Sequence, residues 1–269
     1  MSRLIKCDFF FLILCGSLLF FAKITAQEYP IKKLEGFEKV AISPLVYICP
    51  HFLSDEECDH LIEIARSSLK RTEVIDPHSP HSKTSTGRTS LGTFLPFITK
   101  DQVVINIRAR IAKITEIPLE RAERMQILYY DIGGEFVPHY DYFDLATLGG
   151  LVNYNRGGQR IATFIVYLNT PEKGGETFFL EADLKIVPEK GKALLFYNLR
   201  EEGWTDPMSL HAGLPVLEGE KWLMTQWLRE KSLLKSRLPG PLQREKRARR
   251  SKALKFCCYS FVENRLFSK

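Results

Sequence analysis

The feature that most restricts the fold of this 269-residue chain is a series of short, largely apolar β segments between residues 126 and 228. Each segment is rich in β-branched or aromatic residues, and glycine or proline turn signals separate it from the next. The expected strands are Gln126 to Tyr130, Arg160 to Leu168, Thr177 to Leu180, Leu184 to Val187, Ala193 to Tyr197, and Lys221 to Leu228. Many short strands at such spacing predict a sandwich, a barrel or a jelly roll.

Two helices are expected before these strands. Ser54 followed by Glu57 has the pattern of a capping box, and apolar residues then recur at helical spacing, which predicts a helix over residues 54–70. A second helix is expected over residues 101–114, with Pro118 closing the connection. The polar segment 71–94 between them predicts a long loop of the kind that often carries function. We therefore expect an α+β fold in which N-terminal helices pack on one sheet of the β core.

The expected organisation is a single domain with two extensions. Residues 38–121 would form its helical part with the loop, residues 122–230 its β core, and residues 231–269 a basic tail beyond the Pro- and Gly-containing stretch 238–241. The tail holds twelve basic and two acidic residues, so the formal charge of +6 describes the tail rather than the slightly acidic remainder. Its cluster at 244–255 has the charge to meet nucleic acid, anionic lipid or an acidic protein. A solvated extension is the favoured interpretation, and no nucleic-acid partner is expected.

Residues 1–26 have the pattern of a secretory signal. Arg3 and Lys6 precede an uncharged, mostly apolar stretch from Phe9 to Ala22, and a short segment then ends at Ala26. The apolar stretch is shorter than the roughly 20 residues of a membrane-spanning helix, which favours cleavage. Ile24 fits a cleavage site at Ala26 poorly, so an uncleaved signal that anchors the chain in a membrane stays open. The expected location is the secretory pathway, in the lumen or membrane of the endoplasmic reticulum, or an exported or periplasmic one if the source is bacterial.

Only two of the six cysteines, Cys49 and Cys58, lie in the expected globular part. In an oxidising compartment they would be able to pair. A buried free thiol at Cys58 is an equally good prediction, because this residue falls on the apolar face of the first helix.

A candidate metal site begins at His139 and Asp141. Residues two apart in an extended segment point to the same face, so this imidazole and this carboxylate converge. His211, which precedes the last expected strand, is the candidate for a second imidazole. Two nitrogens and one oxygen with open positions form the facial triad of non-haem iron(II) oxygenases.

Lys221 strengthens this hypothesis. It follows His211 by ten residues, across a connection with Gly213, Pro215 and Gly219 that can turn the chain back toward the same cavity. A dicarboxylate that chelates iron at one end needs a cation such as this ammonium at the other.

The motifs around these residues resemble the catalytic domain of prolyl 4-hydroxylases. The resemblance runs in consistent order over roughly residues 45 to 230 and is far more specific than any single motif. It rests on Phe52 to Cys58 (FLSDEEC), Arg88 to Ser90 (RTS), Tyr130 to Asp141 (YDIGGEFVPHYD), Gly158 to Thr163 (GQRIAT), Gly174 to Thr177 (GGET), His211 to Val216 (HAGLPV), and Lys221-Trp222. The family has a double-stranded β-helix (jelly-roll) core, in agreement with the expected strands.

The resemblance implies a role for each matching position. His139, Asp141 and His211 would bind Fe(II), and Lys221 would bind the distal carboxylate of 2-oxoglutarate. Residues similar to those that line the co-substrate pocket are Tyr130 and Thr177, and residues similar to those that meet the peptide are Arg160, Trp227 and Arg88. Each of these also has an ordinary structural explanation as a packed strand or loop residue. The segment 71–94 resembles the family's mobile lid, and Phe136 stands where relatives often have a tyrosine.

The implied activity is hydroxylation of peptidyl proline at C4, with O2 and 2-oxoglutarate as co-substrates, succinate and CO2 as co-products, and L-ascorbate to restore oxidised iron. The same chemistry on peptidyl lysine or a free amino acid is the first alternative. A peptide-binding module without turnover is the second, although such a module is expected to lose a metal ligand or the lysine, and all four residues are present. The chain resembles the short forms of the family, so no obligate partner subunit is implied.

Overall fold

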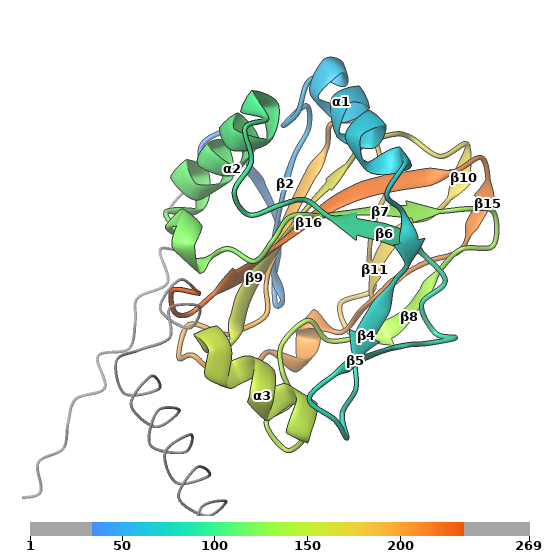
Figure 1. Cartoon of the computed structure of the whole chain (residues 1–269). Helices are drawn as coiled ribbons and strands as arrows, with labels where there is room; N and C mark the ends of the chain where they lie inside the picture. The colour runs from blue at the N-terminus through green and yellow to red at the C-terminus, as the bar shows by residue number, and fades with distance from the viewer. Residues whose placement is uncertain (1–33, 234–269) are drawn as a thin grey trace, which may run out of the picture.

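Two antiparallel sheets that share an apolar interior form the body of the molecule, and the computed structural model describes residues 34–233 (Figure 1). The larger sheet has the strand order β1 (Glu38–Ile42), β2 (Leu45–Cys49), β13 (Ala193–Tyr197), β9 (Arg160–Tyr167), β16 (Lys221–Arg229), β7 (Gln126–Tyr130), β6 (Leu91–Phe94), β3 (Lys70–Arg71). The smaller sheet has the order β12 (Leu184–Ile186), β11 (Thr177–Phe179), β14 (His211–Gly213), β8 (Phe136–His139). Two further sheets have only two strands each: β10 (Lys173–Gly174) pairs with β15 (Val216–Glu218), and β4 (Glu73–Ile75) pairs with β5 (Ser82–Thr84).

The central strands of the large sheet are buried on both faces. Along β9, Phe164 and Val166 belong to the apolar cluster beneath the helices, whereas Ile165 and Tyr167 belong to the cluster between the sheets. All nine residues of β16 are buried as well. Because side chains alternate along a strand, one continuous apolar sequence supplies both cores. This arrangement holds the strands that carry the polar site residues in a fixed register.

Helices α1 (Asp55–Arg66) and α2 (Gln102–Thr115) cover the outer face of the large sheet (Figure 1). The expected capping box is present, because the Ser54 hydroxyl accepts a hydrogen bond from the backbone of Glu57 and the Glu57 carboxylate accepts one from the backbone of Ser54. Both expected helices and their packing on one sheet are thus confirmed. The prediction that the first continues to residue 70 is wrong: Ser67 caps α1, and the chain then enters β3.

Segment 71–94 is not a loop throughout, which corrects the sequence-based prediction. It contains the exposed hairpin β4–β5 and the strand β6, which pairs with β7 in the large sheet. All three residues of β5 are exposed, so they show no alternation of apolar and polar side chains. Without such alternation a strand has no clear sequence signal.

Helix α3 (Leu148–Gly157) was not expected, because glycines are poor helix formers. Its first turn is stabilised by Thr147, whose hydroxyl accepts a hydrogen bond from the backbone of Gly150. The backbone amide of Gly149 donates to the carbonyl of Pro77, which follows β4. The helix therefore packs directly against the hairpin. This contact explains why position 149 is a glycine, although glycine does not favour a helix.

The sequence-predicted strands within the β core agree with β7, β9, β11, β12, β13 and β16 to within a residue at each end. The strands β1, β2, β8, β14 and β15, and the helical turns η1 (Leu119–Arg121) and η2 (Pro207–Ser209), were not expected. All of them are at most five residues long. Apart from the hairpin of β1 and β2, these strands pair with distant parts of the chain.

The ends of the described segment bear on three expectations. The backbone of Lys231 and of Leu233 donates to carbonyls of the core, so these first residues of the expected tail belong structurally to the domain. The expected signal at 1–26 and the rest of the basic tail lie outside the described residues. None of the helices within residues 34–233 has the length and hydrophobicity that a membrane crossing requires.

The two cysteines of the globular part are both free. Cys58 is buried on α1, which agrees with the prediction of a buried free thiol. Burial raises the pKa of this thiol to about 11. The alternative, a disulfide with Cys49, is not formed in the structure.

Candidate active site

His139, Asp141 and His211 converge on one point. The neighbouring strands β8 and β14 place His139 opposite His211 in register, and Asp141 follows β8 by two residues. One ligand atom from each residue lies within 4.8 Å of the other two. Nε2 of His139 is 3.7 Å from Oδ1 of Asp141, and Nε2 of His211 is 3.8 Å from Oδ2 of Asp141. The structure thus brings together the three residues that the sequence pattern selected.

The hydrogen bonds of the two imidazoles suit metal binding. Nδ1 of His139 lies 2.9 Å from the carbonyl oxygen of Val137, and Nδ1 of His211 lies 2.9 Å from that of Ser209. A carbonyl only accepts, so each Nδ1 carries the hydrogen and each Nε2 keeps its lone pair toward the cluster. Two imidazole nitrogens and one carboxylate oxygen are the donor set of a facial iron(II) site. The residues therefore fit the metal that the family uses.

Electrostatics favours the same protonation states. Burial, reinforced by His211, lowers the pKa of His139 to about 3. Burial raises the pKa of Asp141, but the two histidines outweigh it and bring that pKa to about 2. At neutral pH His139 is therefore neutral and Asp141 ionised, which are the forms that bind a divalent metal.

Lys221 is a buried cation that has no ion-pair partner among the described residues. It stands at the start of β16, opposite Tyr130 of β7, and its side chain is 3% exposed. The ammonium lies 5.5 Å from the ring centre of Tyr130 and 5.7 Å from that of Tyr167, and it forms no hydrogen bond or ion pair with any residue in 34–233. Burial lowers its pKa to about 8, against a smaller opposing effect of Glu176. A charge buried in this way requires a partner, and a carboxylate is the natural one.

Thr177 is linked to Lys221 through Tyr167, whose ring lies near the ammonium and whose hydroxyl donates a 2.7 Å hydrogen bond to that of Thr177. The three residues expected to hold the co-substrate, Lys221, Tyr130 and Thr177, are therefore gathered around one buried tyrosine. Tyr167 was not selected from the sequence, because a tyrosine in an apolar strand is usually core.

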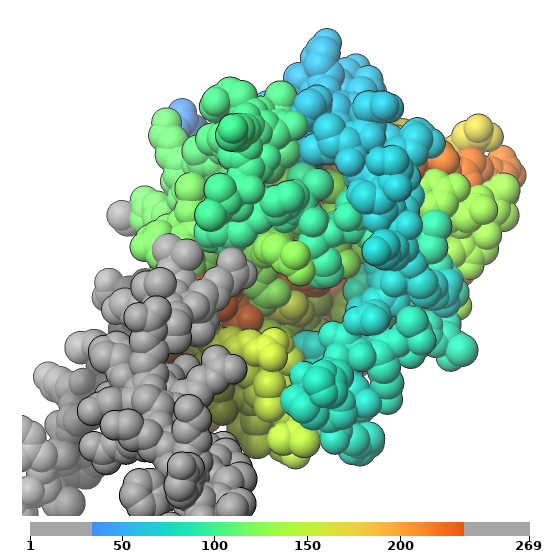
Figure 2. Space-filling model, in the orientation of Figure 1, coloured from blue at the N-terminus to red at the C-terminus, as the bar shows by residue number. Residues whose placement is uncertain are grey.

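A cavity of about 1040 Å³ borders two of the metal ligands. His139 and Asp141 line it, together with all three residues expected to meet a peptide, Arg88, Arg160 and Trp227. Figure 2 shows the surface hollowed between the hairpin β4–β5 and helix α3, which both contribute to the lining. Lys221, Tyr130 and Thr177 lie outside this lining. The residues expected to meet a peptide therefore line this cavity, whereas the residues expected to hold the co-substrate do not.

Arg88 lies inside the cavity wall rather than on an exposed loop. It is buried, its Nε donates to the Ser90 hydroxyl at 3.2 Å, and its guanidinium lies 4.7 Å from the ring centre of Phe136. Phe136 in turn stacks on the His139 imidazole, with ring centres 3.6 Å apart. The residue that departs from the family pattern thus packs directly on a candidate metal ligand.

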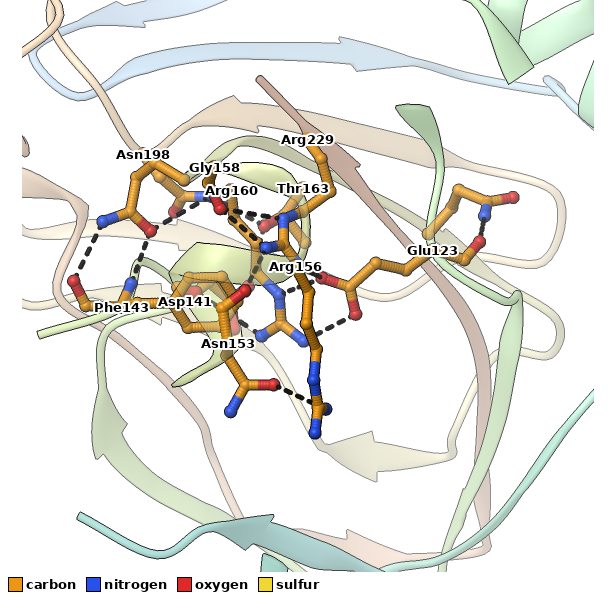
Figure 3. A network of polar contacts seen from close by, with 12 residues as sticks. Glu123, Asp141, Phe143, Asn153, Arg156, Gly158, Arg160, Thr163, Asn198 and Arg229 are labelled. Carbon is orange, nitrogen blue, oxygen red and sulfur yellow. Dashed lines mark hydrogen bonds and ion pairs between the residues drawn. The ribbon is translucent and has the colours of Figure 1, made fainter. Parts of the chain in front are cut away.

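Arg160 is held by an ion pair that the sequence did not reveal. Its guanidinium forms two hydrogen bonds with the Glu123 carboxylate, at 2.8 and 2.9 Å, and stacks 3.9 Å from the ring centre of Trp227. Arg229 donates to the same carboxylate at 2.8 Å (Figure 3). Burial raises the pKa of Glu123, but the two arginines outweigh it, and the carboxyl pKa is lowered. Arg160 is therefore fixed in place, with the Trp227 ring and the guanidinium forming one wall.

Two further residues touch the site without having been selected, Thr163 and Asn198. The Thr163 hydroxyl donates to Oδ2 of Asp141 at 2.8 Å, and the Asn198 amide donates to the Thr163 hydroxyl at 3.0 Å. The one sequence signal for Thr163 is a polar residue within the otherwise apolar stretch Ile161 to Tyr167.

Comparison with known proteins agrees with this geometry. The family model described as the 2OG-Fe(II) oxygenase superfamily matches residues 125–229. Probable prolyl 4-hydroxylase 6 of Arabidopsis thaliana is 39% identical over 241 residues, covering 82% of this chain and 81% of the relative. Prolyl 4-hydroxylase 2 of the same plant is 39% identical over 212 residues, covering 71% of this chain and 69% of the relative.

A solved structure supports the fold as well. The crystal structure of a viral collagen prolyl hydroxylase from Paramecium bursaria Chlorella virus-1, in a 2OG complex, superimposes with a TM-score of 0.53 at 30% identity. The match covers 68% of this chain and 95% of the viral one. The expected α+β fold with a double-stranded β-helix core is thereby confirmed. From its sequence likeness and its fold together, the chain belongs to the prolyl 4-hydroxylases of the 2OG-Fe(II) oxygenase superfamily.

Proposed function

We propose that this protein hydroxylates peptidyl proline at C4 as an iron(II)- and 2-oxoglutarate-dependent dioxygenase. The observation that carries the proposal is the cluster of His139, Asp141 and His211 at the edge of a large cavity. The chain also buries the ammonium of Lys221, which has no ion-pair partner among residues 34–233. The names of the plant relatives supply proline as the residue modified. The overall reaction consumes O2 and 2-oxoglutarate and yields hydroxyproline, succinate and CO2.

His139, Asp141 and His211 would hold the metal through two Nε2 atoms and one carboxylate oxygen. When bound, iron(II) supplies the redox chemistry that couples decarboxylation of the oxo acid and reduction of O2 to oxidation of a C–H bond. The protein's own contribution is to bind and orient the two organic substrates and to exclude competing reactions. Ascorbate would restore oxidised iron.

Lys221 would form an ion pair with the distal carboxylate of 2-oxoglutarate. Thr177 is placed to add a hydrogen bond: its oxygen already accepts from the Tyr167 hydroxyl, so its own hydrogen remains available to a carboxylate. The ring of Tyr130 would pack against the apolar carbons of the co-substrate. In a buried pocket such charge-assisted contacts are considerably stronger than in water.

The cavity favours a peptide over a free amino acid. Its volume of about 1040 Å³ is at the upper end of the sizes of small-molecule pockets, and a single amino acid would fill only a small part of it. Arg88 and Arg160 present guanidinium groups to its interior, and these can donate to the carbonyl groups of a peptide backbone. Trp227 would pack against the proline ring beside the metal.

The proposal is tested with the purified full-length protein, iron(II), ascorbate, 2-oxoglutarate and a library of proline-containing peptides. We expect succinate formation to match the gain of one oxygen mass per peptide, and amino-acid analysis to identify 4-hydroxyproline. His139→Ala and Asp141→Ala should abolish turnover, whereas His60→Ala, a histidine on α1 outside the site, should not. Oxygen gained on lysine, or on no peptide at all despite metal and 2-oxoglutarate binding, would contradict the assignment.

We also propose that the protein works in the secretory pathway, in the lumen or membrane of the endoplasmic reticulum. The support is the signal pattern at residues 1–26. Protease treatment of isolated microsomes that contain the full-length protein tests this location. We expect cleavage only after detergent opens the membrane, and cleavage in intact microsomes would contradict the proposal.

A further inference from the structure

A chain of two hydrogen bonds ties Asp141 to the large sheet. Thr163 on β9 donates from its hydroxyl to Oδ2 of Asp141 at 2.8 Å, and Asn198, just after β13, donates from Nδ2 to the Thr163 hydroxyl at 3.0 Å. Thr163 and Asn198 are fully buried. Figure 3 shows this chain beside the Glu123, Arg160 and Arg229 ion cluster. That cluster also reaches Asp141, because Nη1 of Arg160 donates to its backbone carbonyl at 3.4 Å, but only the Thr163 hydroxyl donates to its carboxylate among residues 34–233.

The direction of these two hydrogen bonds follows from the groups involved. A hydroxyl has a single hydrogen, and a carboxylate accepts but does not donate, so the Thr163 hydrogen points to Asp141. Its oxygen must then accept, and the Asn198 amide is the donor. Oδ1 of Asn198 has no partner within the described part of the chain, so donation to Thr163 is the one contact its side-chain amide makes there.

Asn198 is itself fixed by its backbone. Its amide donates to the carbonyl of Ile161 at 2.9 Å, and its carbonyl accepts from the backbone amide of Asp206 at 2.9 Å. Thr163 is fixed by β9, which pairs with both β13 and β16. Both donors therefore sit on backbone that is itself held by hydrogen bonds.

We propose that Thr163, held by Asn198, is a positioning residue that commits one oxygen of Asp141 to the protein and leaves Oδ1 as the single oxygen offered to the metal. This inference rests on the proposed iron site. A carboxylate that binds through both oxygens occupies an additional coordination position, and the two co-substrates need those positions open. Hydrogen bonds to ligating carboxylates orient them and tune the site in this way.

The test compares metal binding by the full-length protein and its variants, with cobalt(II) alone and iron(II) alone as anaerobic probes. Thr163→Val keeps the shape of the side chain and removes the hydroxyl. We expect it to weaken metal binding by about 10- to 100-fold and to lower the intensity of the visible cobalt(II) absorption, the signature of a higher coordination number. Thr163→Ser restores the hydroxyl donor. Its metal affinity and its cobalt(II) absorption should lie within about threefold of those of the original protein, a much smaller change than the one expected for Thr163→Val.

Thr115→Val is the matched control, because Thr115 is a buried threonine on α2 whose hydroxyl donates to the backbone of Ile111. It should lower thermal stability without changing metal affinity. Asn198→Leu should give a smaller loss than Thr163→Val, and the double variant should resemble Thr163→Val alone, because Asn198 acts through Thr163.

The outcomes separate the two proposals. If the original protein binds neither metal, the proposed function fails. If it binds them and folded Thr163→Val binds equally well with the same cobalt(II) spectrum, the positioning role is overturned while the proposed function stands. If Thr163→Val does not fold, Thr163→Ser and Asn198→Leu decide: equal affinity for Asn198→Leu and the original protein would overturn the role of Asn198.

Discussion

The carbonyl oxygen of Asp76 occupies the space that a side chain on Gly149 would need: a Cβ at Gly149 would lie 2.1 Å from that oxygen. Asp76 directly follows β4, and Gly149 is in the first turn of α3, so this contact locks the hairpin β4–β5 onto the helix. Both elements form the wall of the cavity in which a peptide is expected to bind. The width of the cavity therefore depends on the absence of one methyl group.

Gly149→Ala should separate the hairpin from α3. We expect the KM for peptide to rise by about three- to tenfold with little change in kcat, since overpacking displaces elements that touch the peptide and not the metal ligands. The thermal midpoint should fall, although alanine is the better helix former by about 1 kcal/mol. Steady-state kinetics and thermal melts check both. Leu151→Ala, at an exposed position of the same helix, is the control, and an equal rise in KM there would refute the steric explanation.

Lys221→Met should separate co-substrate binding from stability. Losing the ammonium leaves a buried carboxylate without its partner, so the Kd of 2-oxoglutarate should rise by at least about 100-fold. The free energy of unfolding of the ligand-free protein should nevertheless increase, by on the order of 1–3 kcal/mol, because burial disfavours the charge of Lys221 and lowers its pKa. Calorimetric titration and denaturant unfolding measure the two quantities. Lys185→Met, at an exposed lysine, should change neither.

Binding of 2-oxoglutarate should weaken in alkaline solution. The pKa of Lys221 in the ligand-free protein is lowered to about 8, so its ammonium is fully present below that pH and is lost as the pH rises through it. The Kd should increase by about tenfold for each pH unit above 8 until the pKa of the bound state is reached. Titrations between pH 6.5 and 9.5, with manganese(II) in place of iron(II) to prevent turnover, test this. A Kd that does not vary with pH would mean that another group holds the carboxylate.

Glu123→Gln should be one of the most destabilising single changes near the site. Arg160 and Arg229 share this one carboxylate, and its removal leaves two buried cations facing each other. We expect a loss of about 3–5 kcal/mol in the free energy of unfolding. Because the folded-state pKa of Glu123 is lowered, its contribution is present above the ordinary glutamate pKa and disappears as the solution is acidified below it. The difference between the two proteins should therefore shrink in acid, whereas Glu202→Gln, at an exposed glutamate, should have no effect at any pH.

The metal cluster was accessible from sequence because its information is local. His139 and Asp141 are two residues apart in an extended segment, and His211 precedes a turn-rich segment that leads to Lys221. The central strands were accessible for a similar reason, since β7 and β13 are short apolar stretches bounded by turns. In the first case the two-residue period carries the prediction, and in the second the short length of the apolar stretch and the turns that bound it do.

The residues that sequence could not supply owe their roles to contacts between distant segments. The sequence does not distinguish Glu123 from other glutamates, and its role comes from the ion pairs with Arg160 and Arg229. Gly149 disfavours a helix by itself, and its role comes from the close approach of the Asp76 carbonyl. Thr163 has the same character, because its partner Asn198 is 35 residues away in the chain. Contacts of this kind form only when the chain has folded, and no local sequence pattern signals them.

The alternation of side chains along β9 links folding accuracy to metal uptake. Thr163 points to the metal ligands, whereas its neighbour Phe164 packs beneath the helices. A slip of one residue in the pairing of β9 would remove the Thr163 hydroxyl from Asp141 and bring either Ala162 or Phe164 to its position, depending on the direction of the slip. A misregistered chain would then be unable to present its carboxylate to iron, so metal binding would discriminate between correctly and incorrectly paired molecules during biosynthesis.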